Sequence, residues 1–305
     1  MMVLGFDTSN YTTSVAAFDG QQGRNCSRLL DVRPGELGLR QSDAVFSHVK
    51  RLPELTRQLF GQLDGAAVTA VGVSSRPRAV EGSYMPCFLS GVSAAETMAA
   101  AMGIPCYRFS HQQGHIAAVL WSAGRMEWMK QPFLAWHLSG GTTELLLAEP
   151  EEKNVSVTRI GGTSDISAGQ IMDRTGLLLG LNFPAGRQLD QLSQEGEAKP
   201  FRVKTAELQF SFSGLENKIK EFYAAGGSRE DTAAYAVSSV CSAVYRTTED
   251  ARKQYGDLPV IFSGGVASNS LLRKVCKPLG AVFAPPEYST DNALGIAVLT
   301  WLQEA

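Results

Sequence analysis

The chain opens with the stretch Val3-Leu-Gly-Phe-Asp-Thr-Ser-Asn-Tyr-Thr-Thr-Ser-Val-Ala-Ala-Phe18, and a stretch of the same pattern, Phe133-Leu-Ala-Trp-His-Leu-Ser-Gly-Gly-Thr-Thr-Glu-Leu-Leu-Leu-Ala148, recurs in its second half. Each predicts two short strands joined by a turn, because apolar runs rich in strand-forming residues stop at small hydroxyl residues and glycine. The expected strands span 3–7 and 14–18 in the first stretch and 133–138 and 144–148 in the second. Internal duplication of this kind predicts two similar α/β domains that face each other across a cleft.

The elements expected after each opening follow the same alternation of strands and helices. After the first, hydrophobic periodicity predicts a helix over 42–63 interrupted near Pro53, a strand over 68–74, a helix over 86–102, and a strand over 105–109 that leads into a further helix. After the second, it predicts strands over 155–160, 260–262 and 281–283, helices over 167–179, 215–223 and 229–255, and a last helix over 291–303. We therefore expect one domain of residues 1–125 plus the C-terminal helix 290–305, and another of residues 126–289.

Composition describes an ordinary soluble globular protein. The 305 residues are 44% apolar and 19% charged, and the net charge of −2 leaves no global electrostatic footprint for nucleic acid or a membrane. The five cysteines are scattered without metal-clip spacing, which suits buried thiols in a reducing compartment. No basic segment precedes an apolar core at the N-terminus, so we expect no signal peptide and a cytoplasmic location.

Two of the four histidines lie four residues apart, in Ser110-His-Gln-Gln-Gly-His115. Ser110 and Gln113 form a potential capping box ahead of an apolar stripe, which predicts a helix despite the cost of Gly114. On a helix, His111 and His115 share one face, and two neutral imidazoles aimed at one point suit zinc or ferrous iron with a third, carboxylate ligand. The alternative is an ordinary helix N-terminus with two polar histidines.

Three turns are candidates for a nucleotide. Ser139-Gly-Gly-Thr-Thr143 exposes backbone N–H groups to phosphate, Asp7 in the first turn offers a carboxylate to a metal or a water, and Phe262-Ser-Gly-Gly-Val-Ala-Ser-Asn269 presents bare backbone to adenine beside the Asn269 amide. Taken singly, these patterns also describe a hairpin turn or a helix N-cap, and Asp165, Asp173 and Asp190 are the kind of aspartate that caps a helix. Asp165 and Asp173 are expected to bracket the helix over 167–179.

The ordered set of motifs resembles one family, the catalytic subunit of tRNA threonylcarbamoyladenosine synthase, long catalogued as O-sialoglycoprotein endopeptidase or glycoprotease. The resemblance runs nearly end to end and rests on Leu4-Gly-Phe-Asp-Thr-Ser9, His111-x-x-Gly-His115, Ser139-Gly-Gly-Thr142, Asp165-x-x-Ala-Gly169-x-x-x-Asp173, Phe210-Ser-Phe-Ser-Gly-Leu215, Gly264-Gly-Val-Ala-x-Asn269 and Thr290-Asp-Asn292.

The resemblance implies an actin/hexokinase/Hsp70-type (ASKHA) α/β fold, with two ribonuclease H-like domains around a nucleotide cleft. It implies a metal-dependent transfer of threonylcarbamoyl from its adenylate to a tRNA adenosine, within a multi-protein complex that includes a paralogous partner subunit. The metal, iron or zinc, would be held by His111, His115 and Asp291. The resemblance aligns Leu138, Ser139, Gly140, Gly141 and Thr142 with a substrate-binding loop, and Asp173, Gly186, Asp190 and Asn269 with contacts to ATP or to threonylcarbamoyl-adenylate. Together with the turns described above, we expect Asp7, Ser139, Gly140 and Gly141 to be catalytic, and Gly264 and Gly265 to contact the nucleotide as well.

The chain departs from the family pattern around these motifs. Tyr11 and Thr12 replace an acidic pair, Gln113 replaces a glutamate, Thr142 replaces a histidine, and Arg76-Pro-Arg78 replaces Gly-Pro-Gly. These departures predict a divergent paralogue whose isolated chain modifies tRNA weakly or not at all.

Other functions follow from the same residues. A paralogue could use nucleotide and metal on another carbamoyl or phosphoryl acceptor, or act as a non-catalytic partner, although a scaffold need not keep a ligand set. A zincin peptidase is disfavoured, because Gln112 stands where His-Glu-x-x-His has its general base. Given the net charge, tRNA would need a partner subunit or a local patch such as Lys199, Arg202 and Lys204.

Overall fold

The computed structural model describes residues 1–9, 11–31, 39–63, 65, 67–289 and 291–305. The chain divides into two compact units. The first comprises Met1–Lys130, Glu149–Val157 and Thr290–Ala305, and the second comprises Gln131–Ala148 and Thr158–Ser289. Asn10 in the first turn and Thr290 in the last motif lie outside the described residues.

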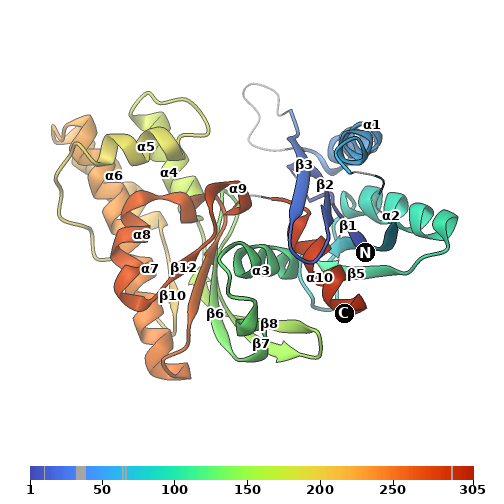
Figure 1. Cartoon of the computed structure of the whole chain (residues 1–305). Coiled ribbons are helices and arrows are strands. Elements are labelled where there is room, and N and C mark those ends of the chain that lie inside the picture. The colour runs from blue at the N-terminus through green and yellow to red at the C-terminus, as the bar shows by residue number, and fades with distance from the viewer. Residues whose placement is uncertain (10, 32–38, 64, 66, 290) are drawn as a thin grey trace. The chain divides into compact units, whose positions relative to one another are not determined.

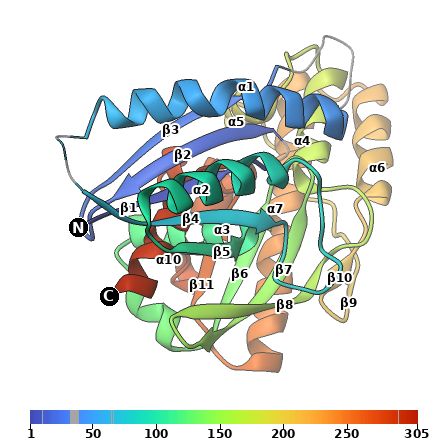
Figure 2. The same cartoon turned by 90° about the vertical axis from the view of Figure 1, so that its right-hand side faces the viewer.

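The first unit is built on a five-stranded sheet of order β3-β2-β1-β4-β5. Strands β1, β2 and β3 are antiparallel neighbours, and β4 and β5 continue the sheet parallel to β1. Helices α1 and α2 cover one face and α3 and α10 the other, as Figures 1 and 2 show. The elements are β1 (Met2–Asp7), β2 (Thr12–Phe18), β3 (Gly23–Leu29), α1 (Gln41–Phe60), β4 (Val68–Arg76), α2 (Phe88–Met102), β5 (Cys106–Ser110), α3 (His111–Ser122), the 3₁₀ helix η1 (Met126–Lys130) and α10 (Leu294–Glu304).

The second unit repeats this topology. Its sheet has the order β12-β11-β6-β7-β8-β10-β9, in which β8-β7-β6-β11-β12 corresponds to β3-β2-β1-β4-β5. As in the first unit, the central strand has an antiparallel neighbour, β7, and a parallel one, β11. The elements are β6 (Phe133–Leu138), β7 (Thr143–Glu151), β8 (Asn154–Thr163), α4 (Ala168–Leu178), α5 (Gly186–Ser193), β9 (Thr205–Ala206), β10 (Gln209–Phe210), α6 (Ser213–Ala224), α7 (Arg229–Tyr255), β11 (Val260–Ser263), η2 (Gly265–Ser268), α8 (Ser270–Cys276), η3 (Lys277–Leu279), β12 (Val282–Phe283) and α9 (Pro286–Ser289).

The core of the second unit forms where α7 packs against β6. The Trp136 side chain is fully buried there, and its indole N–H donates a hydrogen bond to Thr248 Oγ1 at 2.8 Å, which satisfies the one polar atom that would be costly to bury. The matching strand orders of the two sheets confirm the predicted α/β fold with an internal duplication.

Among the described residues, no helix combines the length and the hydropathy needed to cross a bilayer.

Three local predictions for the first unit were wrong. Helix α1 runs without interruption through Pro53. Proline has no N–H, so the Val49 carbonyl one turn earlier loses its hydrogen-bond donor within the helix. Val49 is 57% exposed, so water can take the place of that donor. Strand β3 was missing from the expected elements because it is a polar edge strand in which only Cys26 is buried. Helix α10 begins at Leu294 and not at 291, so Asp291 precedes the helix.

Candidate functional site

The two histidines of the candidate metal site lie at the start of α3, where β5 turns directly into the helix. Ser110 ends the strand and caps the helix: its hydroxyl accepts from Gln113 N–H at 3.2 Å, and Gln113 Oε1 accepts from Ser110 N–H at 3.0 Å. The predicted capping box is therefore confirmed. The Gln113 amide also donates to the Val155 carbonyl at 2.9 Å, a bond that a glutamate carboxylate could not donate. Gln113 therefore also ties α3 to β8.

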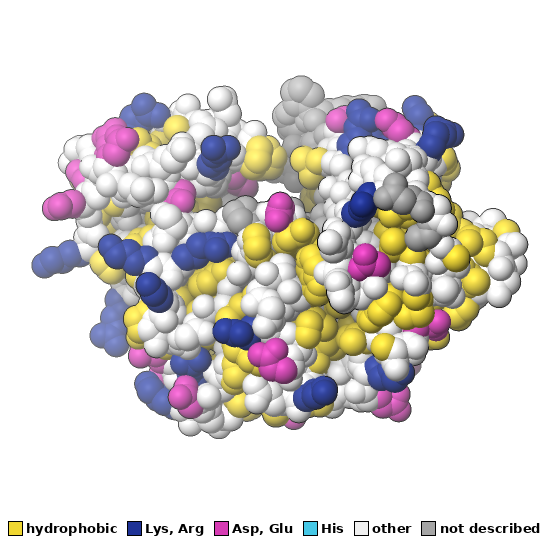
Figure 3. Space-filling model, in the orientation of Figure 1, with side chains coloured by type: hydrophobic (Ala, Val, Ile, Leu, Met, Phe, Trp, Pro, Cys, Tyr) yellow, Lys and Arg dark blue, Asp and Glu magenta, His cyan; other side chains and the backbone are white. Residues whose placement is uncertain are grey.

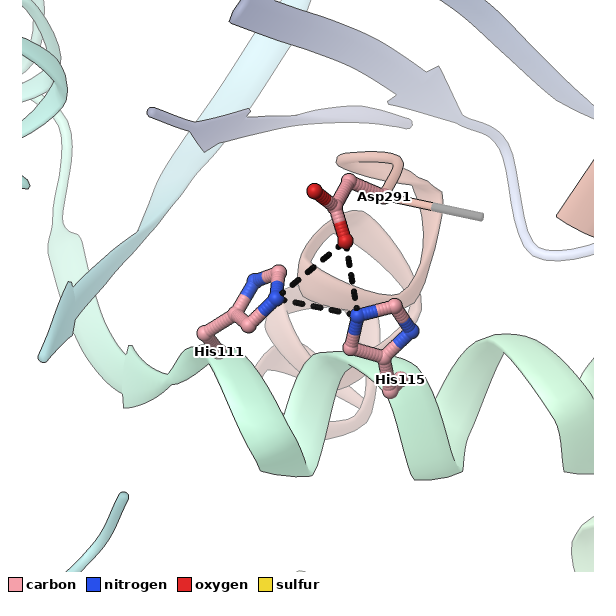
Figure 4. A group of neighbouring side chains, drawn as sticks. All are labelled: His111, His115 and Asp291. Carbon is pink, nitrogen blue, oxygen red and sulfur yellow. Dashed lines mark hydrogen bonds and ion pairs between the residues drawn. The ribbon is translucent and has the colours of Figure 1, made fainter. Parts of the chain in front are cut away.

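His111, His115 and Asp291 point toward one another (Figure 4). His115 Nε2 lies 2.9 Å from His111 Nε2 and 3.2 Å from Asp291 Oδ1, and His111 Nε2 lies 3.5 Å from Asp291 Oδ1. The two imidazoles come from successive turns of α3, whereas the carboxylate comes from the segment just before α10.

A close contact between α3 and α10 brings the Asp291 carboxylate to the two imidazoles. A Cβ added to Gly295 would lie 1.8 Å from the Gly114 carbonyl oxygen, so the helices cross at a distance that only glycine allows. Gly114, which weakens the helix prediction, is therefore part of the contact that brings Asp291 to the histidines.

Asp7 lies behind His111, at the carboxyl end of β1. Its side chain is 1% exposed, and its Oδ2 lies 2.7 Å from His111 Nδ1. This contact keeps a proton on Nδ1 and orients the ring so that the His111 Nε2 atom faces His115 and Asp291. Burial opposes charge on both groups, yet the Asp7 and Asp291 carboxylates raise the pKa of His111 to about 10, and His111 lowers the pKa of Asp7.

The donor set fits a small divalent cation. Two imidazole nitrogens and a carboxylate oxygen are common ligands of zinc and of non-haem iron. A tetrahedral ion with bonds of about 2.0–2.1 Å has ligand–ligand edges of about 3.3–3.4 Å. The three separations of 2.9, 3.2 and 3.5 Å bracket that value, so an ion needs only shifts of a few tenths of an ångström.

The Ser139-Gly-Gly-Thr142 turn joins β6 to β7 in the second unit. Ser139 N–H donates to the Thr142 carbonyl at 2.8 Å, and the Ser139 hydroxyl accepts from Thr142 N–H at 3.1 Å, so both ends of the turn are tied. Within the described part of the chain, the Gly140 and Gly141 amides have no acceptor, and nothing lies within 4 Å of a Cβ built on either. Two adjacent open N–H groups on a fixed turn suit an anion.

A second glycine turn follows the neighbouring strand β11. Gly264 has φ +87°, and a Cβ there would lie 2.2 Å from the Leu138 carbonyl oxygen, so glycine is needed both for the backbone conformation and for the close approach to β6. Gly265, next to it, has open space where a Cβ would be. The two glycine turns thus follow adjacent parallel strands, the usual place for a ligand in an α/β sheet.

His137 was not among the predicted site residues, because it lies inside an apolar strand and looks structural. It pairs in register with Ser263 on β11, one residue before Gly264. The Ser263 hydroxyl donates to the Trp136 carbonyl at 3.0 Å, so at 3.1 Å it accepts from His137 Nδ1–H. The sequence did contain a signal for this pair: a polar residue stands one or two positions before each glycine turn that ends a strand.

Asp190 and Asn269, predicted to contact a nucleotide, bind each other. The Asn269 amide donates to Asp190 Oδ1 at 2.8 Å, and its Oδ1 caps α8 by accepting from Leu272 N–H at 2.9 Å. Asp190 also accepts from Ser270 N–H and from the Ser270 hydroxyl. The pair joins the start of α8 to α5, a helix the sequence did not reveal.

Asp173 and Gly186 lie on either side of the loop between α4 and α5. Asp173 is inside α4 and does not bracket it, and its Oδ1 accepts from Ala185 N–H at 2.8 Å. Burial raises the pKa of Asp173. Gly186 begins α5, with open space where a Cβ would be.

Asp165 has a structural role. Its carboxylate accepts from the Phe212 and Ser213 amides at 2.8 and 3.2 Å and from the Ser211 hydroxyl. It therefore holds the Phe210–Leu215 motif at the start of α6. Despite some burial, these hydrogen bonds hold the pKa of Asp165 well below its usual value.

The other departures from the family lie at the ends of strands in the first unit. Tyr11 is 38% exposed and Thr12 is buried at the start of β2. Arg76 ends β4 with an exposed side chain, and the Pro77 carbonyl accepts from Gln112 N–H in the first turn of α3 at 3.1 Å.

Comparison with known sequences gives a consistent result. A family profile described as tRNA N6-adenosine threonylcarbamoyltransferase matches residues 38–298. The tRNA N6-adenosine threonylcarbamoyltransferase of Bordetella avium is 30% identical over 321 residues, covering 97% of this chain and 90% of that protein. The enzyme of the same name from Thermosipho africanus is 29% identical over 317 residues, covering 98% and 93%.

Solved structures share the fold at low sequence identity. HypF from T. kodakarensis superposes with a TM-score of 0.64 at 14% identity, over 99% of this chain and 47% of that one. The activator of 2-hydroxyisocaproyl-CoA dehydratase from Clostridium difficile, with bound ADPNP, gives 0.55 at 14% identity, over 100% and 95%. The fold is of the actin/hexokinase/Hsp70 type, as the motifs implied.

Proposed function

The chain belongs to the tRNA N6-adenosine threonylcarbamoyltransferase family, and we propose that it transfers a threonylcarbamoyl group from its adenylate to the exocyclic amine of a tRNA adenosine, using a divalent ion. The amine nitrogen forms a bond to the carbamoyl carbonyl carbon, the bond from that carbon to the adenylate oxygen breaks, and AMP leaves. The amine gives up one proton in the exchange. The chain supplies orientation and charge stabilisation for this step.

The convergence of His111, His115 and Asp291 is the observation that carries the proposal. We assign these three side chains as ligands of iron or zinc, with Asp7 as the group that orients His111. When bound, such an ion acts as a Lewis acid on an oxygen of the substrate. The chain directs both Nε2 atoms at one point and holds Asp291 charged: burial opposes the charge, but hydrogen bonds from His111 and His115 lower the pKa of Asp291 well below its usual range.

We assign the phosphate of the donor to the open amides of Gly140 and Gly141. Preorganised N–H groups stabilise a charge that grows on the leaving phosphate at no cost of reorganisation. Ser139 holds the turn through its N–H and hydroxyl, and the backbone of Leu138 lies close against Gly264. In this turn Thr142 stands where the family has a histidine. His137, on strand β6 just before the turn, supplies an imidazole instead.

The adenosine part is assigned to the second glycine turn and the polar pair beside it. Gly265 leaves room for a flat base, and Asp173 and Gly186 border the neighbouring loop. Asp190 Oδ1 is used by the Asn269 and Ser270 side chains, whereas Oδ2 accepts one amide and keeps capacity for a ribose hydroxyl.

An adenine-nucleotide-using paralogue with another carbamoyl or phosphoryl acceptor is the second candidate. The exposed Tyr11 and the buried Thr12 support it, because neither supplies the charge of an acidic pair. We expect the isolated chain to modify tRNA weakly or not at all.

We further propose that the chain works in a multi-protein complex with tRNA and a paralogous subunit. The groove between α1 and α2, lined by Leu52, Pro53, Ala94 and Met98, is apolar, and Phe46 and Val49 on the same helix are 65% and 57% exposed. An apolar helix pair of this kind suits a helical face of a second subunit.

Calorimetric titration of the metal-loaded chain with ATP and with a non-hydrolysable threonylcarbamoyl-adenylate analogue tests the proposal. Gly265→Trp fills the second turn and should abolish both titrations, whereas Gly214→Trp, at another open glycine in α6, should leave them unchanged. Mass spectrometry of nucleosides from tRNA incubated with the donor then identifies the acceptor. If the unaltered chain binds neither ligand, the proposal is wrong; if it binds the donor but a partner-supplemented reaction leaves tRNA unmodified, the second candidate replaces it.

A further inference from the structure

The segment between α5 and β9 lies extended along α7 and is fixed at several points. Glu197 N–H donates to Asp231 Oδ1 at 2.8 Å, and Phe201 N–H donates to the Ser239 hydroxyl at 2.8 Å. Arg246, on α7, donates to the Val203 carbonyl at 2.6 Å. The polar run expected to be an excursion from the second domain is therefore anchored to its longest helix.

In this segment the apolar side chains face the core and the basic side chains are exposed to solvent. Val203 is 2% exposed and Phe201 is half-buried, and both pack on the core of the second unit. Lys199, Arg202 and Lys204 are exposed. The anchored backbone thus presents three cations outward while its apolar side chains hold it down.

The three cations form no ion pair within the described part of the chain, although Glu197 and Glu207 flank the segment. Among the residues that the structure describes, Lys199, Arg202 and Lys204 have no carboxylate within salt-bridge distance, and residues 198–206 contain no acidic residue. Arg246 adds a fourth positive charge: burial and, to a smaller extent, Arg202 lower the pKa of Arg246, and Asp250 opposes that shift. We call Lys199, Arg202 and Lys204 the basic strip. It is a local concentration of positive charge in a chain whose net charge is −2. Figure 3 shows the lysine and arginine side chains of one face of the chain, which lie over both units.

We propose that the basic strip is the surface on which this protein holds the phosphate backbone of its RNA substrate. The proposal rests on the proposed function, which supplies the RNA, and adds where and how it is held. Phosphate contacts position a nucleic acid without reading its sequence, and they need cations that are exposed, unpaired and held in place. A fixed backbone lowers the ordering cost of binding.

Salt dependence of RNA binding tests the strip. Unmodified tRNA is titrated with the full chain, by fluorescence anisotropy, between 50 and 200 mM monovalent salt. The test variant carries Lys199→Ala, Arg202→Ala and Lys204→Ala; the charge-matched control carries Arg24→Ala, Lys50→Ala and Lys130→Ala, three exposed cations of the first unit. Each lost phosphate contact removes about 0.7–0.9 from the slope of log affinity against log salt, so the test variant should lose about 2–3.

The expected result is an affinity at least about 20- to 40-fold below that of the unaltered chain at 50 mM salt, with most of this difference lost by 200 mM. The control should keep the slope of the unaltered chain. Equal slopes for the two variants would overturn the proposal, and so would an unaltered chain that binds no tRNA. Failure of the proposed function is distinguished because donor binding by calorimetry does not involve the strip and is measured on the same variants.

Discussion

The crossing of α3 and α10 leads to a graded prediction for three glycines. In Gly295→Ala the new Cβ would lie 1.8 Å from the Gly114 carbonyl oxygen and 2.9 Å from Ala118 N. A carbon atom in ordinary contact keeps about 3.5 Å, so the helices must separate by more than about 1 Å. Because Asp291 precedes α10 and the histidines lie on α3, that separation exceeds the roughly 0.2 Å tolerance of a metal–ligand bond.

We therefore expect Gly295→Ala to be destabilised by about 1–3 kcal/mol, the usual cost of overpacking, and to lower Tm by several degrees. Its affinity for Co(II), measured by competition with a chelator, should fall at least about tenfold. Gly114→Ala should be milder, since its Cβ meets the flexible Ile296 Cδ1 at 2.8 Å. Gly214→Ala in α6, with nothing within 4 Å, should be neutral or stabilised by up to about 1 kcal/mol.

Thermal and chemical unfolding, together with Co(II) competition on all three variants, give the comparison. The reasoning is refuted if Gly295→Ala matches Gly214→Ala in both stability and metal affinity, or if Gly114→Ala is the more damaging change. Should Gly295→Ala fail to fold, the intermediate position of Gly114→Ala still decides the matter.

Three further outcomes are expected. Burial lowers the pKa of His48 to about 4, although the Asp7 charge opposes this shift. Between pH 6.5 and 4 the unfolded chain therefore binds a proton that the folded chain does not, so the free energy of unfolding rises with pH through this window. His48→Asn, which can keep the 2.8 Å bond to the Thr13 hydroxyl, should remove up to about 3 kcal/mol of that rise in urea unfolding series, and unchanged pH dependence would contradict this. Asp7→Asn should weaken Co(II) binding about 10- to 100-fold through loss of the carboxylate behind His111, with an affinity within twofold of the parent as the adverse result. Asp165→Ala should cost about 1–3 kcal/mol and speed proteolysis after residue 210, and equal cleavage rates would show that the loop is held by other contacts.

The parts of the fold that local chemistry controls could be predicted from the sequence. Ser110 and Gln113 predicted the cap of α3, and the four-residue spacing predicted that His111 and His115 share a face. Asp291 is 176 residues from His115, so only the return of α10 onto α3 brings it there, and no local pattern encodes that return.

The elements that the sequence did not reveal are those held by contacts far along the chain. Helix α5 has one buried residue, Leu189, and no side-chain cap, and Asp190 helps to fix it through Asn269 and Ser270 on another helix. Pro53 was read as a break because its local cost is clear, whereas the packing of Leu52 and Leu55 that offsets it is visible only in the folded unit.

The two halves share a topology and differ in chemistry at the same point of it. The first strand of one half ends at a carboxylate, Asp7, that faces an imidazole; the first strand of the other ends at Leu138, before a turn of open glycine amides. Carboxylates and imidazoles suit a cation, and bare amides suit an anion. The two copies of one fold therefore differ: the residues of one unit suit a cation, and those of the other suit an anion. It follows that Asp7→Asn should weaken metal binding while leaving ATP binding of the metal-free chain unchanged, and that Gly265→Trp should do the reverse. A variant that lost both together would show that the two chemistries are coupled through more than their shared topology.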